Sequence, residues 1–186
     1  MSINNLSTPA SGRFSLSAAA LHILAMVLML MDHLWATLLP AQDWLTCAGR
    51  LAFPIFCYCL TVGLLYTHDI RRYLGRLAIF AVVSQPFWIL AFNADDILGN
   101  LTNWNIFFTL FLSLLAMWGL TTRRWWLFVL GVLVLAFGSF DYNYNGVILI
   151  LIFYFCRNKP ALLAGLYTLF WIPALWGGSL EDPLAL

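Results

Sequence analysis

The chain has 186 residues, of which 63% are hydrophobic and only 9% are charged. Soluble domains average about 25% charged residues, so this balance excludes an ordinary soluble protein and predicts one whose surface faces lipid. The formal net charge of +1 gives no indication of a nucleic-acid partner or of a strongly acidic partner.

Polar segments divide the chain into a polar tail over 1–17, a single transmembrane domain over 18–176 and a short tail over 177–186. A bilayer-spanning helix needs about 20 mostly apolar residues, or somewhat fewer where neighbouring helices shelter its ends. The domain contains seven runs of this kind: Ala18–Leu39, Ala48–Tyr66, Tyr73–Phe92, Leu101–Leu120, Trp125–Phe140, Tyr142–Cys156 and Pro160–Trp176. We therefore expect an all-α integral membrane protein, a compact bundle of about seven transmembrane helices. The fifth and sixth runs are short, so re-entrant segments are the alternative there.

The first run lacks a small-x-small cleavage site and contains charged and histidine residues, which predicts a retained helix rather than a cleaved signal peptide. Basic residues stand before the first run and on every second connection after it: Arg13, Arg71, Arg72, Arg76, Arg123, Arg124, Arg157 and Lys159. The positive-inside rule then predicts a cytoplasmic N-terminus and an outer C-terminus. Arg50, at the outer start of the second run, is the exception.

The four cysteines, Cys47, Cys57, Cys59 and Cys156, follow no metal-binding or redox spacing. We interpret them as small apolar residues. The sequence also has no HExxH-type metal motif and no glycine-rich phosphate loop, so we expect no metal in the site.

Charged side chains meet near the outer ends of the first two runs. Asp32 and His33 lie toward the end of the first run, and Arg50 lies just inside the second. An ionised side chain at mid-membrane costs about 2.5–3.5 kcal/mol, so such groups usually pair with each other or face a wet cavity. We expect Asp32 to pair with Arg50, and His33 to be free to accept a proton. The alternative is an ion pair near the interface that only fixes helix packing.

Further polar side chains approach the same outer side from the later runs: Gln85, Asn103, Asn105, Thr109, Asp141, Asn143 and Asn145. On the cytoplasmic side, the arginines chiefly orient the protein in the membrane. A minority hypothesis is that some of them also bind the phosphates of a cytoplasmic cofactor, because guanidinium groups suit phosphate geometry.

Five motifs occur in order along the chain: "MLMDH" at 29–33, "GRLAFPIF" at 49–56, "RRYLGRL" at 71–77, "NIFFTL" at 105–110 and "DYNYNGV" at 141–147. Together they resemble the TraX family of integral membrane proteins, whose founding function is acetylation of conjugative pilin. The resemblance covers the chain from about Leu21 to about Phe155. One position departs from the family pattern, since Val62 stands where many members carry an acidic residue.

This resemblance implies an acetyltransferase of the bacterial cytoplasmic (inner) membrane that uses acetyl-CoA as its acyl donor. His33 would be the general base or carry the acetyl group briefly, Asp32 would orient it, and Arg50 would stabilise the oxyanion. We expect the acceptor, an amine or hydroxyl at the outer face, to meet Gln85, Asn105 and Asp141. The CoA phosphates would lie on the cytoplasmic side at Arg72, Arg76 and Arg123, with the pantetheine arm threading between helices.

Two other classes of function stay open at this point. A small proton-coupled transporter or channel would use Asp32, His33 and Arg50 as a pathway, although repeated halves, common in transporters, do not occur in this sequence. A non-catalytic membrane scaffold would need the same residues only to hold helices together. The sequence leaves the acceptor and the oligomeric state undetermined.

Overall fold

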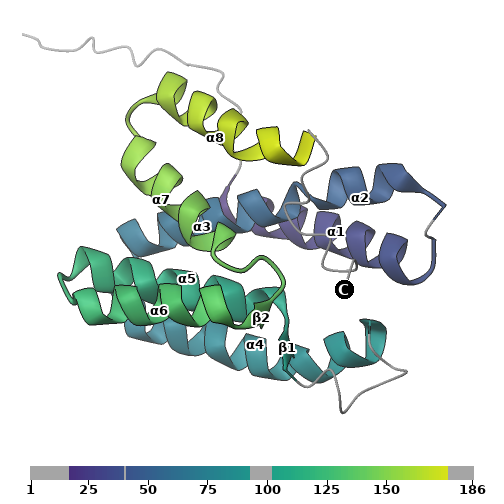
Figure 1. Cartoon of the computed structure of the whole chain (residues 1–186), viewed down its shortest axis with the longest axis horizontal. Helices are drawn as coiled ribbons and strands as arrows, with labels where there is room; N and C mark the ends of the chain where they lie inside the picture. Colours follow the sequence, from purple (N-terminus) through teal and green to yellow (C-terminus); the bar gives the residue numbers. More distant parts are fainter. Residues whose placement is uncertain (1–16, 40, 93–101, 176–186) are drawn as a thin grey trace, which may run out of the picture.

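The computed structural model describes residues 17–39, 41–92 and 102–175, which form a bundle of helices with one short pair of strands (Figure 1). In chain order the elements are α1 (Ala18–Thr37), α2 (Asp43–Gly49), α3 (Ala52–Tyr66), α4 (Ile70–Phe92), β1 (Asn103–Trp104), α5 (Ile106–Thr121), α6 (Trp125–Phe137), β2 (Ser139–Phe140), α7 (Asn145–Cys156) and α8 (Pro160–Leu175).

Each of the seven predicted runs contains a helix, and the chain is a helical membrane protein. Three helical stretches are long and apolar enough to cross a bilayer: Ala18–Thr37, Trp44–Tyr66 and Ile70–Phe92. The later apolar helices, from α5 to α8, are shorter. The number of crossings and the orientation in the membrane therefore stay predictions. Most of the predicted tails, over 1–16 and 176–186, and the connection over 93–101 lie outside the described residues.

The second predicted run differs from its expected form, because its helix starts earlier and is interrupted. Residues Asp43–Gly49 already form α2, and the chain bends at Arg50 and Leu51 before α3 begins. Pro54 explains the interruption, since its ring excludes the carbonyl four residues earlier while the first turn of a helix tolerates proline. The result is an elbow with Arg50 at its corner.

The structure adds one feature to the predicted all-α fold, the short parallel pairing of β1 with β2. Asn103 lies opposite Ser139, and Trp104 lies opposite Phe140. The helix within the fourth predicted run, α5, starts at Ile106 with Asn105 as its N-cap. The pair ties the beginning of α5 to the end of α6.

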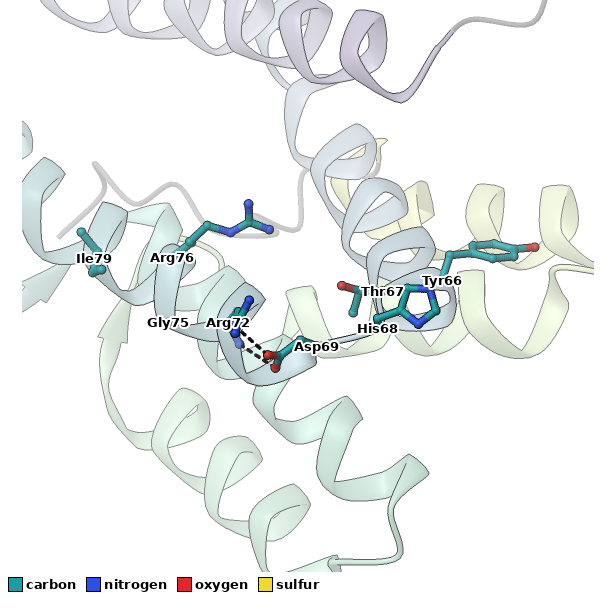
Figure 2. Close-up of a pocket in the computed structure, with 8 residues that line it drawn as sticks. All are labelled: Tyr66, Thr67, His68, Asp69, Arg72, Gly75, Arg76 and Ile79. Carbon is teal, nitrogen blue, oxygen red and sulfur yellow. Dashed lines mark hydrogen bonds and ion pairs between the residues drawn. The ribbon is translucent and has the colours of Figure 1, made fainter.

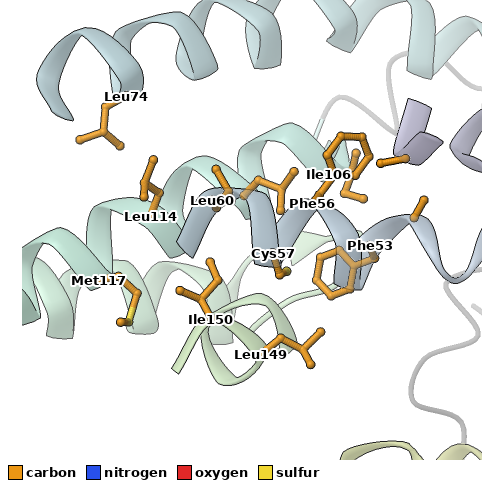
Figure 3. Packing of buried hydrophobic residues seen from close by; sticks show 13 residues of the cluster. Phe53, Phe56, Cys57, Leu60, Leu74, Ile106, Leu114, Met117, Leu149 and Ile150 are labelled. Atoms are coloured by element: carbon orange, nitrogen blue, oxygen red, sulfur yellow. The ribbon is translucent and has the colours of Figure 1, made fainter. Parts of the chain in front are cut away.

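The core lies around α5, which packs against α3, α4, α6 and α7. Figure 3 shows Leu114 and Met117 of α5 facing side chains of α3 and α7, among them Cys57 and Ile150. The outer faces are apolar as well, since Phe87 of α4 is 70% exposed and Phe137 of α6 is 87% exposed. Lipid rather than water suits such a surface.

Apart from α2 and α3, which together form one apolar stretch, successive helices run in opposite directions, so the bundle has two chemically different ends (Figure 1). One end, here called the carboxylate end, brings together Asp32 of α1, Arg50 at the elbow and Asp141 beside β2. The opposite end, called the basic end, holds the other described cations: Arg71, Arg72, Arg76, Arg123, Arg124, Arg157 and Lys159. This separation matches the alternation of charge predicted from the sequence.

Candidate functional site

Asp32 is fixed by contacts between α1 and α2. The Thr46 hydroxyl donates a hydrogen bond to Asp32 Oδ1 at 3.0 Å. Gly49 lies directly against the same residue, because a Cβ at Gly49 would stand 2.8 Å from Asp32 Cα. Asp32 is therefore held between α1 and α2, which approach each other so closely here that only glycine fits at position 49.

The predicted ion pair between Asp32 and Arg50 is wrong. Within the described part of the chain, an ion pair joins Asp69 to Arg72, but none joins Asp32 to Arg50. The Arg50 side chain is exposed, and Asp32 accepts a hydrogen bond from Thr46 instead. Arg50 is nevertheless close enough for its charge to act on the loop after β2.

His33 uses one ring nitrogen within α1 and presents the ring to α4. Its Nδ1 lies 2.7 Å from the carbonyl oxygen of Met29, and its ring meets the Phe92 ring edge-on at 5.0 Å between centroids. A carbonyl can only accept, so Nδ1 carries the hydrogen and Nε2 is left as the proton-accepting nitrogen. Asp32 and His33 thus face different helices, as expected from the 100° turn between neighbouring helical residues.

Tyr142 is the residue of this end that sequence reasoning missed. Its ring stacks on Phe53 of α3, with 3.8 Å between centroids and 11° between planes. Burial raises the pKa of its phenol, and the negative charges of Asp32 and Asp141 raise it further while Arg50 opposes them. The hydroxyl is thus a neutral hydrogen-bond donor at physiological pH. The only signal in the sequence was its place within "DYNYNGV", since an aromatic residue near a helix end otherwise indicates the membrane interface.

The loop that carries Tyr142 is held by backbone hydrogen bonds. The Asp141 N–H donates to the Trp104 carbonyl at 3.2 Å, and the Asn145 N–H donates to the Tyr142 carbonyl at 3.0 Å. Asn143 adopts a φ of 42°, a left-handed conformation that asparagine tolerates better than most residues. The strand pair and this turn therefore fix the position of Asp141 and Tyr142 relative to α5.

Gln85 and Asn105, predicted to contact the acceptor, do come together. Gln85 Nε2 donates to the Asn103 carbonyl at 2.6 Å, and Gln85 Oε1 accepts from the Asn105 N–H at 3.1 Å. The Asn105 amide donates to the Ala81 carbonyl and to the Ser84 hydroxyl, and its oxygen caps α5. Asn105 is only 2% exposed. In this conformation both residues join α4 to α5, and contact with an acceptor stays a prediction.

The basic end contains an open pocket of about 690 Å³ between the end of α3 and the beginning of α4 (Figure 2). Its lining includes His68, Asp69, Arg72 and Arg76. Asp69 caps α4 by accepting from the backbone of Arg72 at 3.1 Å, and its other oxygen lies 3.0 Å from Arg72 Nε. Two of the three arginines predicted to bind the cofactor therefore line one pocket, and the ion pair with Asp69 partly neutralises Arg72.

Arg123, the third of these arginines, lies in the turn between α5 and α6 and does not line the pocket. Its φ of 56° places its backbone in the left-handed region. The carboxylate end and the pocket are separated by α3, whose 15 residues span about 22 Å at 1.5 Å per residue. Among the described residues, no three His, Cys, Asp or Glu side chains are grouped so as to hold a metal ion.

Comparison with known proteins finds one matching family and one similar curated protein. The family model described as "TraX protein" matches residues 17–175. A curated protein of Dichelobacter nodosus, "Probable fimbrial assembly protein FimC, serogroup H1", is 35% identical over 116 residues, which cover 58% of this chain and 48% of that protein. The chain spans about half the length of this relative. No solved structure matches the chain.

Proposed function

The chain belongs to the TraX family, and from this premise we propose that it is a membrane-embedded acetyltransferase. It transfers an acetyl group from cytoplasmic acetyl-CoA to an amine or hydroxyl presented at the outer face of the bacterial inner membrane. The observation that carries this proposal is the chemical polarity of the bundle. His33, Asp32 and Tyr142 lie at one end, and a pocket lined by Arg72 and Arg76 lies at the other.

The proposed reaction needs a base, a charge-stabilising group and a leaving thiolate. The acceptor nitrogen or oxygen attacks the thioester carbonyl carbon, and the carbon–sulfur bond breaks to release CoA as a thiolate. Nε2 of His33 takes the proton from the acceptor and returns it to the thiolate. Asp32 would help to orient His33, and Arg50 would stabilise the developing oxyanion. An acetylated His33 is the alternative route through the same atoms.

The donor would bind at the basic end, because guanidinium groups match the geometry of phosphates. Arg76 provides positive charge in the pocket, and Arg72 adds more when its pairing with Asp69 loosens. Arg123 would contribute from the neighbouring turn. The pantetheine arm then has to cover the distance of about 22 Å along α3.

The acceptor would be a pilin-like subunit, because the relative from Dichelobacter nodosus is named as a fimbrial assembly protein. Its free N-terminal amine is the simplest group for the proposed chemistry. The positive-inside rule places the carboxylate end, with the acceptor, on the outer side of the membrane. Gln85, Asn105 and Asp141 would line the approach of this acceptor.

The proposal is tested with protein purified in detergent, acetyl-CoA and a peptide that carries a free N-terminal amine, with released CoA thiol and peptide mass as the readouts. His33→Ala should abolish release and acetylation. His22→Ala is the matched control, since His22 lies on the same helix and its Nδ1 makes the same 2.7 Å contact with the carbonyl four residues earlier. Equal turnover in both variants contradicts the assignment of His33.

Neither alternative function has an observation in its favour. A proton-coupled transporter predicts solute uptake into proteoliposomes that acetyl-CoA does not affect and that His33→Ala removes. A scaffold predicts that His33→Ala leaves function intact as long as the protein folds. Absence of both turnover and thermal stabilisation by acetyl-CoA in the wild-type protein would contradict the acetyltransferase proposal.

A further inference from the structure

We infer that Tyr142 is a catalytic residue of the carboxylate end, whose phenol donates a hydrogen bond to the thioester carbonyl oxygen as that oxygen becomes negative. This inference rests on the proposed acetyl transfer. It adds a catalytic residue from a different part of the chain, because Tyr142 lies on the loop between β2 and α7 whereas Asp32 and His33 belong to α1.

The position of Tyr142 is fixed from both sides. Its ring is stacked on Phe53, which is itself only 1% exposed and belongs to the bundle core. Its own backbone carbonyl accepts from Asn145, and the preceding residue is bonded to β1 through the Trp104 carbonyl. A donor that is already held in place does not have to be reoriented during the reaction. This property makes its hydrogen bond effective in stabilising a transition state.

The hydroxyl of Tyr142 is available for a ligand. Tyr142 is only partly buried, and its hydroxyl makes no hydrogen bond within the described part of the chain. The charges around it are Asp32 from α1, Arg50 from the elbow and Asp141 from its own loop. Two neighbouring carboxylates disfavour a third negative charge there, so the phenol keeps its proton and acts as a donor.

A purely structural role gives a different expectation. If Tyr142 served only to pack on Phe53, then its ring would matter and its oxygen would not. Tyr142→Phe separates the two roles, since it keeps the stacked ring and removes only the hydroxyl. Tyr144→Phe is the matched control, because Tyr144 lies two residues away in the same segment and is 49% exposed.

The experiment measures kcat and KM for acetyl-CoA with the amine peptide as acceptor, together with the midpoint of thermal unfolding. Tyr142→Phe should lower kcat by about 10²–10³-fold, the usual effect of removing one donor to an oxyanion. KM and the unfolding midpoint should stay close to those of the wild-type protein, because the stack and the donor pocket are unchanged. Tyr144→Phe should leave all three quantities unchanged.

The outcomes separate this inference from the proposed function. Wild-type turnover that persists in Tyr142→Phe overturns the role of Tyr142 and leaves the acetyltransferase proposal standing. A fall in kcat accompanied by an equal fall in unfolding midpoint overturns it too, since that result indicates packing. A wild-type protein that neither binds nor turns over acetyl-CoA overturns the transfer reaction, and the catalytic role of Tyr142 with it.

Discussion

Replacing Gly49 by alanine tests the contact that fixes Asp32. Gly49 ends α2, and a Cβ added there would stand 2.8 Å from both Asp32 Cα and Asp32 Oδ1. Real Cβ atoms essentially never approach other heavy atoms so closely. Since one of these atoms belongs to the backbone of α1, no rotation of a side chain relieves the clash. The helices must move apart, and the bond from Thr46 to Asp32 must lengthen or break.

The size of the effect follows from two opposing terms. Forcing one extra methyl group into a packed contact costs about 1–3 kcal/mol, whereas alanine is favoured over glycine within a helix by up to about 1 kcal/mol. Because the contact includes backbone, we expect the first term to dominate and the free energy of unfolding to fall by about 1–2 kcal/mol. For a chain of this length, that corresponds to about 2–8 °C in the unfolding midpoint.

The assay is thermal unfolding of purified protein in one detergent, with Gly165→Ala as the matched control. Gly165 also lies in a helix, but a Cβ there meets nothing within 4 Å. This control should be as stable as the wild-type protein or slightly more stable. An unfolding midpoint for Gly49→Ala equal to that of Gly165→Ala would refute the close approach of α1 and α2.

Three further predictions concern other contacts. Gly146→Ala would place a Cβ 2.6 Å from the Ser113 hydroxyl, so the free energy of unfolding should fall by about 1–3 kcal/mol. In a double-mutant cycle measured by thermal unfolding, Ser113→Ala should recover most of this loss. Asn105→Ala removes a helix cap and buried hydrogen bonds, so its unfolding free energy should drop by at least about 1–2 kcal/mol; an unchanged midpoint contradicts this role. Asp69→Asn keeps the cap of α4 but frees Arg72 from its ion pair. Calorimetry should then show tighter binding of acetyl-CoA at equal stability. Weaker binding would contradict the proposal that the CoA phosphates bind at Arg72.

The helices were predictable because each apolar run is bounded by polar residues, and lipid imposes a helix on such a run. The meeting of Asp32, Arg50 and Asp141 at one end also followed from the sequence, since antiparallel neighbours bring alternate connections together. The predicted ion pair between Asp32 and Arg50 does not form, because the chain is interrupted at Arg50 and the side chain of this residue is exposed. That elbow is a consequence of Pro54 acting on backbone geometry, which hydrophobicity does not encode.

The strand pair and the position of Tyr142 were not predictable for a related reason. Two-residue strands have no periodicity to detect, and their pairing joins Asn103 to Ser139 from distant parts of the chain. Without this pair, the position of the loop after β2 is undefined. An aromatic residue in an undefined loop gives no indication of its stacking on Phe53.

The pairing of β1 with β2 also bears on how the protein is made. The chain emerges from its N-terminus, so Asp32 and His33 are synthesised well before Ser139 and Phe140 can dock beside Asn103 and Trp104. Only then is Tyr142 held in place. A nascent or truncated chain that stops within α6 therefore carries His33 without Tyr142, and the two proposed site residues are both present only when synthesis has passed α6.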